Sequence, residues 1–138
     1  MNLKKLEPEL KKANIDAISH NGVVLLVGQV GSESLKARAT QITSDSSSKI
    51  KRIHNELEVA GKTSLLSRSN DIWIATKVRT LMLANSSVPS GQIRVVTDNG
   101  IVYLMGIVSQ ADGDLATDLA RNVSGVTRVV KVFEYVDS

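Results

Sequence analysis

An internal repeat is the feature that most constrains what this chain can fold into. The pattern of residues 15–30 returns at residues 93–108, an offset of 78 residues. Repeats at a fixed period indicate copies of one structural unit, because each copy must fold by the same local rules. Two copies in this chain leave roughly 65 residues each, close to the smallest size that buries a stable core. We therefore expect two small units of the same fold.

Each copy contains a predicted β-hairpin. Asn-Gly dipeptides at positions 21–22 and 99–100 stand between two runs of apolar residues. Asn-Gly supplies the two positive-φ positions of a type I′ turn, which joins antiparallel strands tightly. Gly28 and Gly106 then interrupt the second strand of each hairpin. A glycine there indicates a bulge or a close approach by another backbone, and we expect a helix to cross directly above it.

A helix and a third strand are predicted after each hairpin. Apolar residues recur at helical spacing in both copies, at Leu35, Ala39 and Ile42 and at Leu115, Leu119, Ala120 and Val123. Ser109 with Asp112 predicts the N-terminal cap of the second of these helices, and Gly125 predicts a left-handed stop at its C-terminus. The third strand is predicted from β-branched and aromatic residues over 126–136 and from Ile50, Ile53, Leu57 and Val59.

These elements predict an α+β fold. Strand–helix–strand connections cross over right-handed. Each unit is therefore expected to run helix–hairpin–helix–strand, with a small three-stranded mixed sheet covered by helices on one face. The units differ in their leading helix. In the second unit, Asn70 is predicted to cap a helix over 71–83. The first unit is expected to lack most of its leading helix, of which Leu3, Leu6 and Leu10 remain, broken by Pro8.

Composition excludes several classes of protein. The chain has no cysteine, which rules out disulfides and thiolate metal sites. No apolar run approaches the ~18 residues needed to span a bilayer. The first residues are not a signal peptide as they stand, so the chain is expected either to be cytosolic or to have lost an export segment.

The net charge of +3 is divided into +4 on residues 1–69 and −1 on residues 70–138. This balance permits an anionic partner but is too weak for nucleic acid.

The helix over 71–83 is the candidate functional site. At about 100° per residue, Ile74, Val78 and Leu81 lie within about 60° of one another and form the expected core face. A neighbouring face of the helix carries Trp73, Thr80 and Leu83, and Lys77 and Arg79 flank this face. Apolar side chains bordered by cations suit a bilayer interface, where each cation contributes about 1 kcal/mol at an anionic surface. The alternative is that Trp73 packs against the linker or the other unit, since a lone large aromatic is usually buried.

Catalytic and metal-binding motifs are absent from the sequence. His20 is expected in the first hairpin turn and His54 on a strand, and neither has convergent partners for a metal or a general base. No Ser–His–Asp set, carboxylate pair or phosphate-binding loop is visible. We therefore expect no enzyme, no metal and no cofactor.

The order of helix, Asn-Gly hairpin, Val-x-Leu-x-Gly-x-Val strand, helix, Gly-Val turn and final strand resembles the BON domain. The second copy matches well, at residues 102–108 (Val-Tyr-Leu-Met-Gly-Ile-Val) and 124–129 (Ser-Gly-Val-Thr-Arg-Val). The first copy matches in its hairpin and helix but lacks the Gly-Val turn. The resemblance implies a BON domain over 1–60, incomplete at its N-terminus, a linker over 61–69 and a second BON domain over 70–138.

Two further stretches, residues 69–79 and 24–29, are similar to the dual-BON outer-membrane lipoproteins of Gram-negative bacteria. The resemblance implies a protein anchored by an acylated cysteine, facing the periplasm and supporting envelope integrity. It also implies that the first helix of the second domain binds anionic phospholipid. The chain itself has no anchor cysteine and no signal peptide, so these segments are expected to lie upstream and to have been removed.

Two functional hypotheses follow. In the first, helix 71–83 docks on a surface of anionic phospholipid, phosphatidylglycerol or cardiolipin, and the lipid-binding residues are Trp73, Lys77, Arg79, Thr80 and Leu83. Trp73 and Leu83 would insert, Thr80 would hydrogen-bond headgroups, and the two cations would pair with phosphate. In the second, the protein is a periplasmic adaptor that uses the same helix face to bind an envelope protein, with Trp73 as the hot spot.

Overall fold

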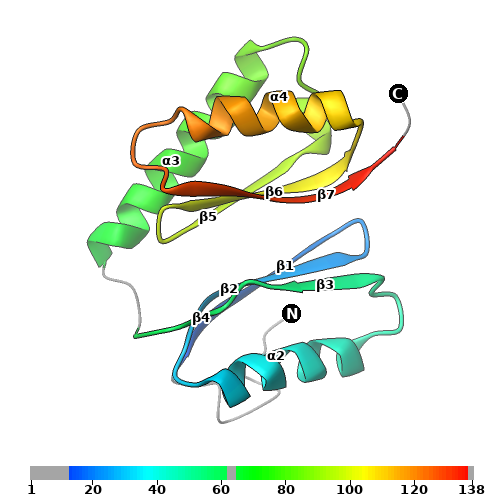
Figure 1. Ribbon diagram of the computed structural model, residues 1–138, viewed down its shortest axis with the longest axis vertical. Helices are drawn as coiled ribbons and strands as arrows, with labels where there is room; N and C mark the ends of the chain where they lie inside the picture. The colour runs from blue at the N-terminus through cyan, green and yellow to red at the C-terminus, as the bar shows by residue number, and fades with distance from the viewer. Residues whose placement is uncertain (1–12, 62–64, 137–138) are drawn as a thin grey trace. The chain divides into compact units, whose positions relative to one another are not determined.

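The computed structural model describes residues 13–61 and 65–136, and the chain divides into two compact units between residues 63 and 64 (Figure 1). Both units contain a β-hairpin, a helix and a final strand that returns parallel to the second strand of the hairpin. The predicted α+β fold with two tandem copies is confirmed. The leading helix of the first unit was predicted around Leu3, Leu6, Pro8 and Leu10, which lie outside the described residues.

The first unit is a mixed sheet with one helix on it. Its elements are β1 (Asn14–His20), β2 (Val23–Val30), α2 (Glu33–Ser46), β3 (Arg52–Asn55) and β4 (Glu58–Val59). β2 lies between β1, which is antiparallel to it, and β3 and β4, which are both parallel to it. The predicted third strand is thus split in two. At the break, the backbone N–H of Leu57 donates to Oδ1 of Asn55 at 3.1 Å, and the Leu57 side chain is buried.

In the second unit, two helices lie side by side on one face of the sheet. Its elements are α3 (Leu65–Ala84), the 3-10 turn η2 (Ser90–Gln92), β5 (Arg94–Asp98), β6 (Ile101–Val108), α4 (Gln110–Arg121) and β7 (Arg128–Tyr135). The sheet order is β5-β6-β7, with β5 antiparallel and β7 parallel to β6. α3 packs beside β5 and α4 beside β7, so the long helix and the short one share one face of the sheet (Figure 1).

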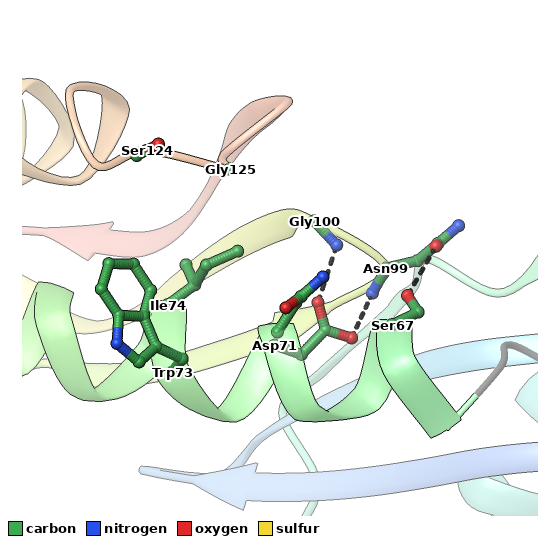
Figure 2. Close-up of a pocket in the computed structure, with 9 residues that line it drawn as sticks. Ser67, Asp71, Trp73, Ile74, Asn99, Gly100, Ser124 and Gly125 are labelled. Carbon is green, nitrogen blue, oxygen red and sulfur yellow. Dashed lines mark hydrogen bonds between the residues drawn. The ribbon is translucent and has the colours of Figure 1, made fainter.

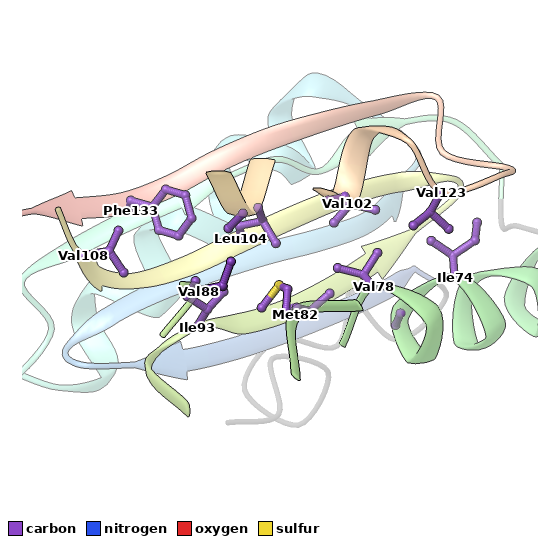
Figure 3. Close-up of a cluster of buried hydrophobic side chains, with 14 residues drawn as sticks. Ile74, Val78, Met82, Val88, Ile93, Val102, Leu104, Val108, Val123 and Phe133 are labelled. Carbon is purple, nitrogen blue, oxygen red and sulfur yellow. The ribbon is translucent and has the colours of Figure 1, made fainter. Parts of the chain in front are cut away.

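The core of the second unit explains which face of α3 is buried. Ile74, Val78 and Met82 point from α3 towards Val102 and Leu104 of the central strand (Figure 3). All five side chains are at most 3% exposed. The prediction for Ile74 and Val78 is confirmed. Met82, which the sequence analysis did not assign to the core, is also buried, whereas the predicted core residue Leu81 is only partly buried.

The hairpin turns are as predicted. Asn21 and Gly22 have φ values of 55° and 80°, and Asn99 and Gly100 have values of 51° and 78°. Two consecutive residues with positive φ define the type I′ turn. In the second unit the turn joins β5 and β6 directly, so its two backbone N–H groups lie at the end of the hairpin.

A neighbouring backbone, and not the expected helix, makes the closest approach to Gly28 and Gly106. A Cβ atom built on Gly28 would lie 1.8 Å from the carbonyl oxygen of Asn14, and one on Gly106 would lie 2.2 Å from that of Gln92. Both atoms belong to the chain beside the start of the first hairpin strand. The glycines, with φ of 127° and 149°, therefore permit the close approach of a neighbouring backbone, the other possibility that the pattern indicated.

Two predicted helix ends also need correction. α3 begins at Leu65, so Asn70 is inside the helix and does not cap it, because no residue of 65–70 is a glycine or proline that would break the helix. α4 ends at Arg121, four residues before Gly125, so this glycine lies in the following turn with φ of 93°. The predicted N-cap of α4 is confirmed, since Oγ of Ser109 accepts a hydrogen bond from the N–H of Asp112 at 3.1 Å.

Candidate functional site

The exposed apolar side chains of α3 form the candidate site. Ile72 is 71% exposed, Trp73 56% and Leu83 74%, and these are the three most exposed large hydrophobic side chains among the described residues. Together they are called the α3 patch. Water is an unfavourable neighbour for so much apolar surface on one element, and such patches mark interaction sites. Packing within the second unit therefore leaves most of the Trp73 side chain uncovered.

Ile72 is the residue that sequence reasoning missed. The predicted core face was centred on Ile74, Val78 and Leu81. In the structure Met82 is also buried and Leu81 is only partly buried, so the centre of the buried face lies further from Leu81 than predicted. At about 100° per residue, Ile72 and Leu83 then lie within about 20° of each other on the outer side. The missed signal was the spacing of i and i+11, which places both side chains in one row.

The charged residues of α3 are unequal in sign and in exposure. Arg68, Lys77 and Arg79 are exposed, whereas the single acidic residue of the helix, Asp71, is 7% exposed. Arg68 was not among the predicted site residues. Every exposed charge on this helix is consequently positive, and it lies beside exposed apolar side chains. The net charge of −1 on residues 70–138 does not reveal this local excess of positive charge on α3.

Asp71 ties the helix to the hairpin. Its carboxylate accepts hydrogen bonds from the backbone N–H groups of Asn99 and Gly100, at 2.7 and 2.8 Å (Figure 2). These are the two N–H groups of the type I′ turn. Hydrogen bonds to a charged acceptor are stronger than neutral ones, so the buried carboxylate is compensated. The contact fixes the beginning of the α3 patch relative to the sheet.

Two of the predicted lipid-binding residues also make contacts within the unit. Nη2 of Arg79 donates to the carbonyl oxygen of Val95 at 3.0 Å, which uses one of its five N–H donors. Oγ1 of Thr80 donates to the carbonyl oxygen of Thr76 at 2.9 Å, so its proton is engaged inside the helix. The Thr80 hydroxyl is therefore mainly a hydrogen-bond acceptor for an external partner. Its lone pairs can bind a hydroxyl or ammonium donor, whereas a phosphate oxygen is itself an acceptor.

A pocket opens at the N-terminal end of the patch. It has a volume of about 410 Å³ and is formed by α3, the β5–β6 turn and the turn before β7 (Figure 2). The lining residues are Ser67, Asn70, Asp71, Trp73, Ile74, Asn99, Gly100, Ser124 and Gly125. All of them belong to the second unit, and Trp73 belongs to both the pocket and the α3 patch. The pocket was not predictable from the sequence, because its walls come from three separate segments.

The histidines and acidic residues form no metal site among the described residues. No group of three or more potential ligands comes together in residues 13–61 and 65–136. His20 ends β1 and His54 lies in β3, and the Nε2 atom of each is buried without a hydrogen-bond partner. Burial lowers the pKa of His54, the positive charge of Arg52 lowers it further, and Glu56 acts in the opposite direction.

The lowered pKa of His54 predicts a loss of stability in acid. The folded state binds this proton more weakly than the unfolded state, whose pKa is about 6.5. The stability is therefore intact above that value and falls as the pH drops through it towards the folded-state pKa. We expect the urea midpoint to decrease between about pH 7.5 and about pH 5, and to decrease less in His54→Leu. An equal decrease in both proteins would contradict the assignment to His54.

The family follows from this fold and from comparison with known proteins. The family model of the BON domain matches residues 3–61 and 70–137. The chain belongs to the BON domain family, in two tandem copies, and the resemblance inferred from the sequence is confirmed.

Curated relatives extend over most of the chain. "Outer membrane lipoprotein DolP" of Haemophilus influenzae is 36% identical over 126 residues, which are 91% of this chain and 65% of that protein. "21 kDa hemolysin" of Actinobacillus pleuropneumoniae is 37% identical over 135 residues, covering 98% of this chain and 69% of that protein. "Osmotically-inducible protein Y" of Escherichia coli is 29% identical, with 87% of this chain and 61% of that protein covered. The chain thus spans roughly two thirds of the length of these relatives.

No helix in the described part of the chain is both long and apolar enough to pass through a bilayer.

Proposed function

We propose that the chain is a non-enzymatic phospholipid-binding protein at the periplasmic face of the outer membrane. It docks on anionic lipid through α3 and supports envelope integrity. The observation that carries the proposal is the composition of one helix surface. The three most exposed large apolar side chains of the described residues lie on α3, and every exposed charge on that helix is basic.

The α3 patch has the chemistry of a membrane interface. Tryptophan prefers the headgroup region, where its ring is in contact with both apolar and polar surroundings. Leu83 and Ile72, which are more exposed than Trp73, are the side chains that enter the acyl region. Lys77 and Arg79 pair with lipid phosphate, and a Lys or Arg near an anionic surface contributes about 1 kcal/mol. The helix lies on the membrane and does not cross it.

The relatives support the location. The name of one of them, "Outer membrane lipoprotein DolP", places that protein in the outer membrane. A lipid anchor holds a protein at the membrane surface, where the weak affinity of a single amphipathic helix is sufficient for contact.

A periplasmic adaptor is the second candidate function. An exposed Trp beside Arg has the composition of a protein-binding hot spot, so the same patch suits an envelope protein. The two functions differ in what the purified chain does alone. Lipid binding requires only a vesicle, whereas adaptor binding requires a second protein.

Vesicle binding tests the proposal with a probe that the chain already contains. Trp73 is its single tryptophan, so its fluorescence reports the α3 patch alone. We expect co-sedimentation with phosphatidylglycerol-containing vesicles and a shift of the emission to shorter wavelength as the indole leaves water. Pure phosphatidylcholine vesicles should give neither. Raising the salt from about 50 mM to about 300 mM should weaken binding, because the contribution of the cations is screened.

The control is the folded state of the same sample, checked by circular dichroism. A well-folded chain that sediments with neither vesicle would overturn the lipid-binding proposal and favour the adaptor. Equal binding to both vesicles would show that the basic residues of α3 do not select anionic lipid.

A further inference from the structure

The pocket beside Trp73 has polar walls and one apolar side. Ser67, Asn70, Asn99 and Ser124 carry hydroxyl or amide groups that both donate and accept hydrogen bonds, although Oγ of Ser67 already donates to Oδ1 of Asn99 at 3.2 Å (Figure 2). Trp73 and Ile74 supply the apolar side (Figure 2). The volume of about 410 Å³ is within the range of small-molecule sites, which combine apolar walls with a few placed polar groups.

Asp71 gives the pocket an acceptor of fixed orientation. Each carboxylate oxygen has two lone-pair positions, and the bonds from the N–H groups of Asn99 and Gly100 use one on each oxygen. The remaining positions can accept hydrogen bonds from the hydroxyl groups of a ligand. Asp71 is 7% exposed as a whole residue and is held by the turn, so its carboxylate does not have to reorganise when a ligand arrives.

Charge decides which ligand class fits. None of the described residues that line the pocket is Lys or Arg, and Asp71 is negative. A phosphate inside the pocket would therefore meet a like charge without a counter-charge. A neutral group with neighbouring hydroxyls is not repelled by Asp71 and can donate hydrogen bonds to its carboxylate. It can also exchange hydrogen bonds with the Ser and Asn side chains and place its C–H groups on the Trp73 ring.

We propose that this pocket is a subsite for a vicinal diol, the group that the glycerol headgroup of phosphatidylglycerol shares with sugars. The headgroup version rests on the proposed function. Trp73 belongs to both the pocket and the α3 patch, so lipid headgroups in contact with the Trp73 ring would lie beside the pocket mouth. Phosphate then remains outside, near the basic residues of α3, and only the terminal diol enters.

Two anionic vesicles separate the diol from the charge. Phosphatidylmethanol has the same single negative charge as phosphatidylglycerol but carries a methyl group in place of the glycerol. We expect the wild-type chain to bind phosphatidylglycerol vesicles about threefold to tenfold more tightly, the difference that one or two net hydrogen bonds make. In Asn70→Ala and Ser124→Tyr, which remove a polar wall or fill the pocket, the two affinities should become equal.

The design keeps the two proposals apart. Affinity for phosphatidylmethanol should be unchanged in both variants, because it depends on the α3 patch. Ser86→Tyr introduces the same aromatic residue at an exposed position outside the pocket and should keep the wild-type preference. Failure to bind either vesicle would overturn the proposed function. Strong and equal binding to both would leave that function intact and overturn the headgroup subsite.

A soluble arm identifies the source of the diol. Glycerophosphoglycerol and methyl glucoside are each titrated into the ¹⁵N-labelled chain. Shifts of the backbone amides of Asn99, Gly100 and Ser124 with the glucoside, but no lipid preference, would assign the pocket to a free sugar or polyol. Shifts with glycerophosphoglycerol together with the lipid preference would assign it to the headgroup. Absence of both the shifts and the preference would overturn the diol subsite altogether.

Discussion

Replacing Trp73 with glutamate is expected to weaken binding to phosphatidylglycerol vesicles by at least about tenfold, close to complete loss in co-sedimentation. Removing a large side chain from an apolar contact costs about 1.5–3 kcal/mol, and about 1.4 kcal/mol corresponds to a factor of ten. The introduced carboxylate adds repulsion from the anionic surface. Trp73 is 56% exposed, so the unit has little packing to lose and should keep its fold. Far-ultraviolet circular dichroism checks that point.

The matched control for this variant is Ser86→Glu, which adds the same charge at an exposed position outside the patch. It should bind nearly as well as the wild type. Ile72→Ser provides a graded companion, because it removes apolar surface without adding charge and should reduce affinity severalfold. If Trp73→Glu bound as tightly as Ser86→Glu, the α3 patch would not be the lipid contact.

Replacing Gly106 with alanine is expected to destabilise the second unit by about 3–5 kcal/mol. The new Cβ would lie 2.2 Å from the carbonyl oxygen of Gln92, and the φ of 149° is unfavourable for any residue with a side chain. A unit of this size is stable by only about 4–11 kcal/mol, so the change removes much of its margin. The measurement is a urea titration followed through Trp73, which lies in this unit.

Gly91→Ala is the control for Gly106→Ala. A Cβ atom at Gly91 meets nothing within 4 Å, so the free energy of unfolding should change by less than about 1 kcal/mol, with slight stabilisation the expected direction. A similar unfolding midpoint for the two variants would mean that the backbone of η2 moves easily and that Gly106 is not required for the close approach.

The elements that depend on short stretches of sequence were predictable. The Asn-Gly turns, the Ser109 cap and the flanking strands each follow from a few adjacent residues, and the structure confirms them. The approximate face of α3 was predictable for the same reason, since Ile74 and Val78 repeat at helical spacing. The position of Trp73 outside that face left both a packed and an exposed side chain possible, and only the structure shows that it is 56% exposed.

Features that depend on contacts between distant segments were not predictable. Asp71 was expected near a helix start, and only its contact with the turn at Asn99 and Gly100 shows why it stands inside a longer helix. Burial of Met82 shifts the outer face enough to include Ile72. The partner of Gly106 is the backbone at Gln92, fourteen positions earlier, and a local pattern does not distinguish it from a crossing helix.

Three hydrogen bonds, made by the side chains of Asp71 and Arg79, join α3 to the hairpin and determine how a membrane would meet this helix. Asp71 holds the turn, and Arg79 holds the carbonyl oxygen of Val95 two helical turns later. The helix is thus already formed and oriented before any lipid is present. Peptides that become helical only on a bilayer lose part of their affinity to that ordering. A surface prepared in advance avoids this loss, so under the proposed function three apolar side chains and a few cations would be enough for reversible attachment.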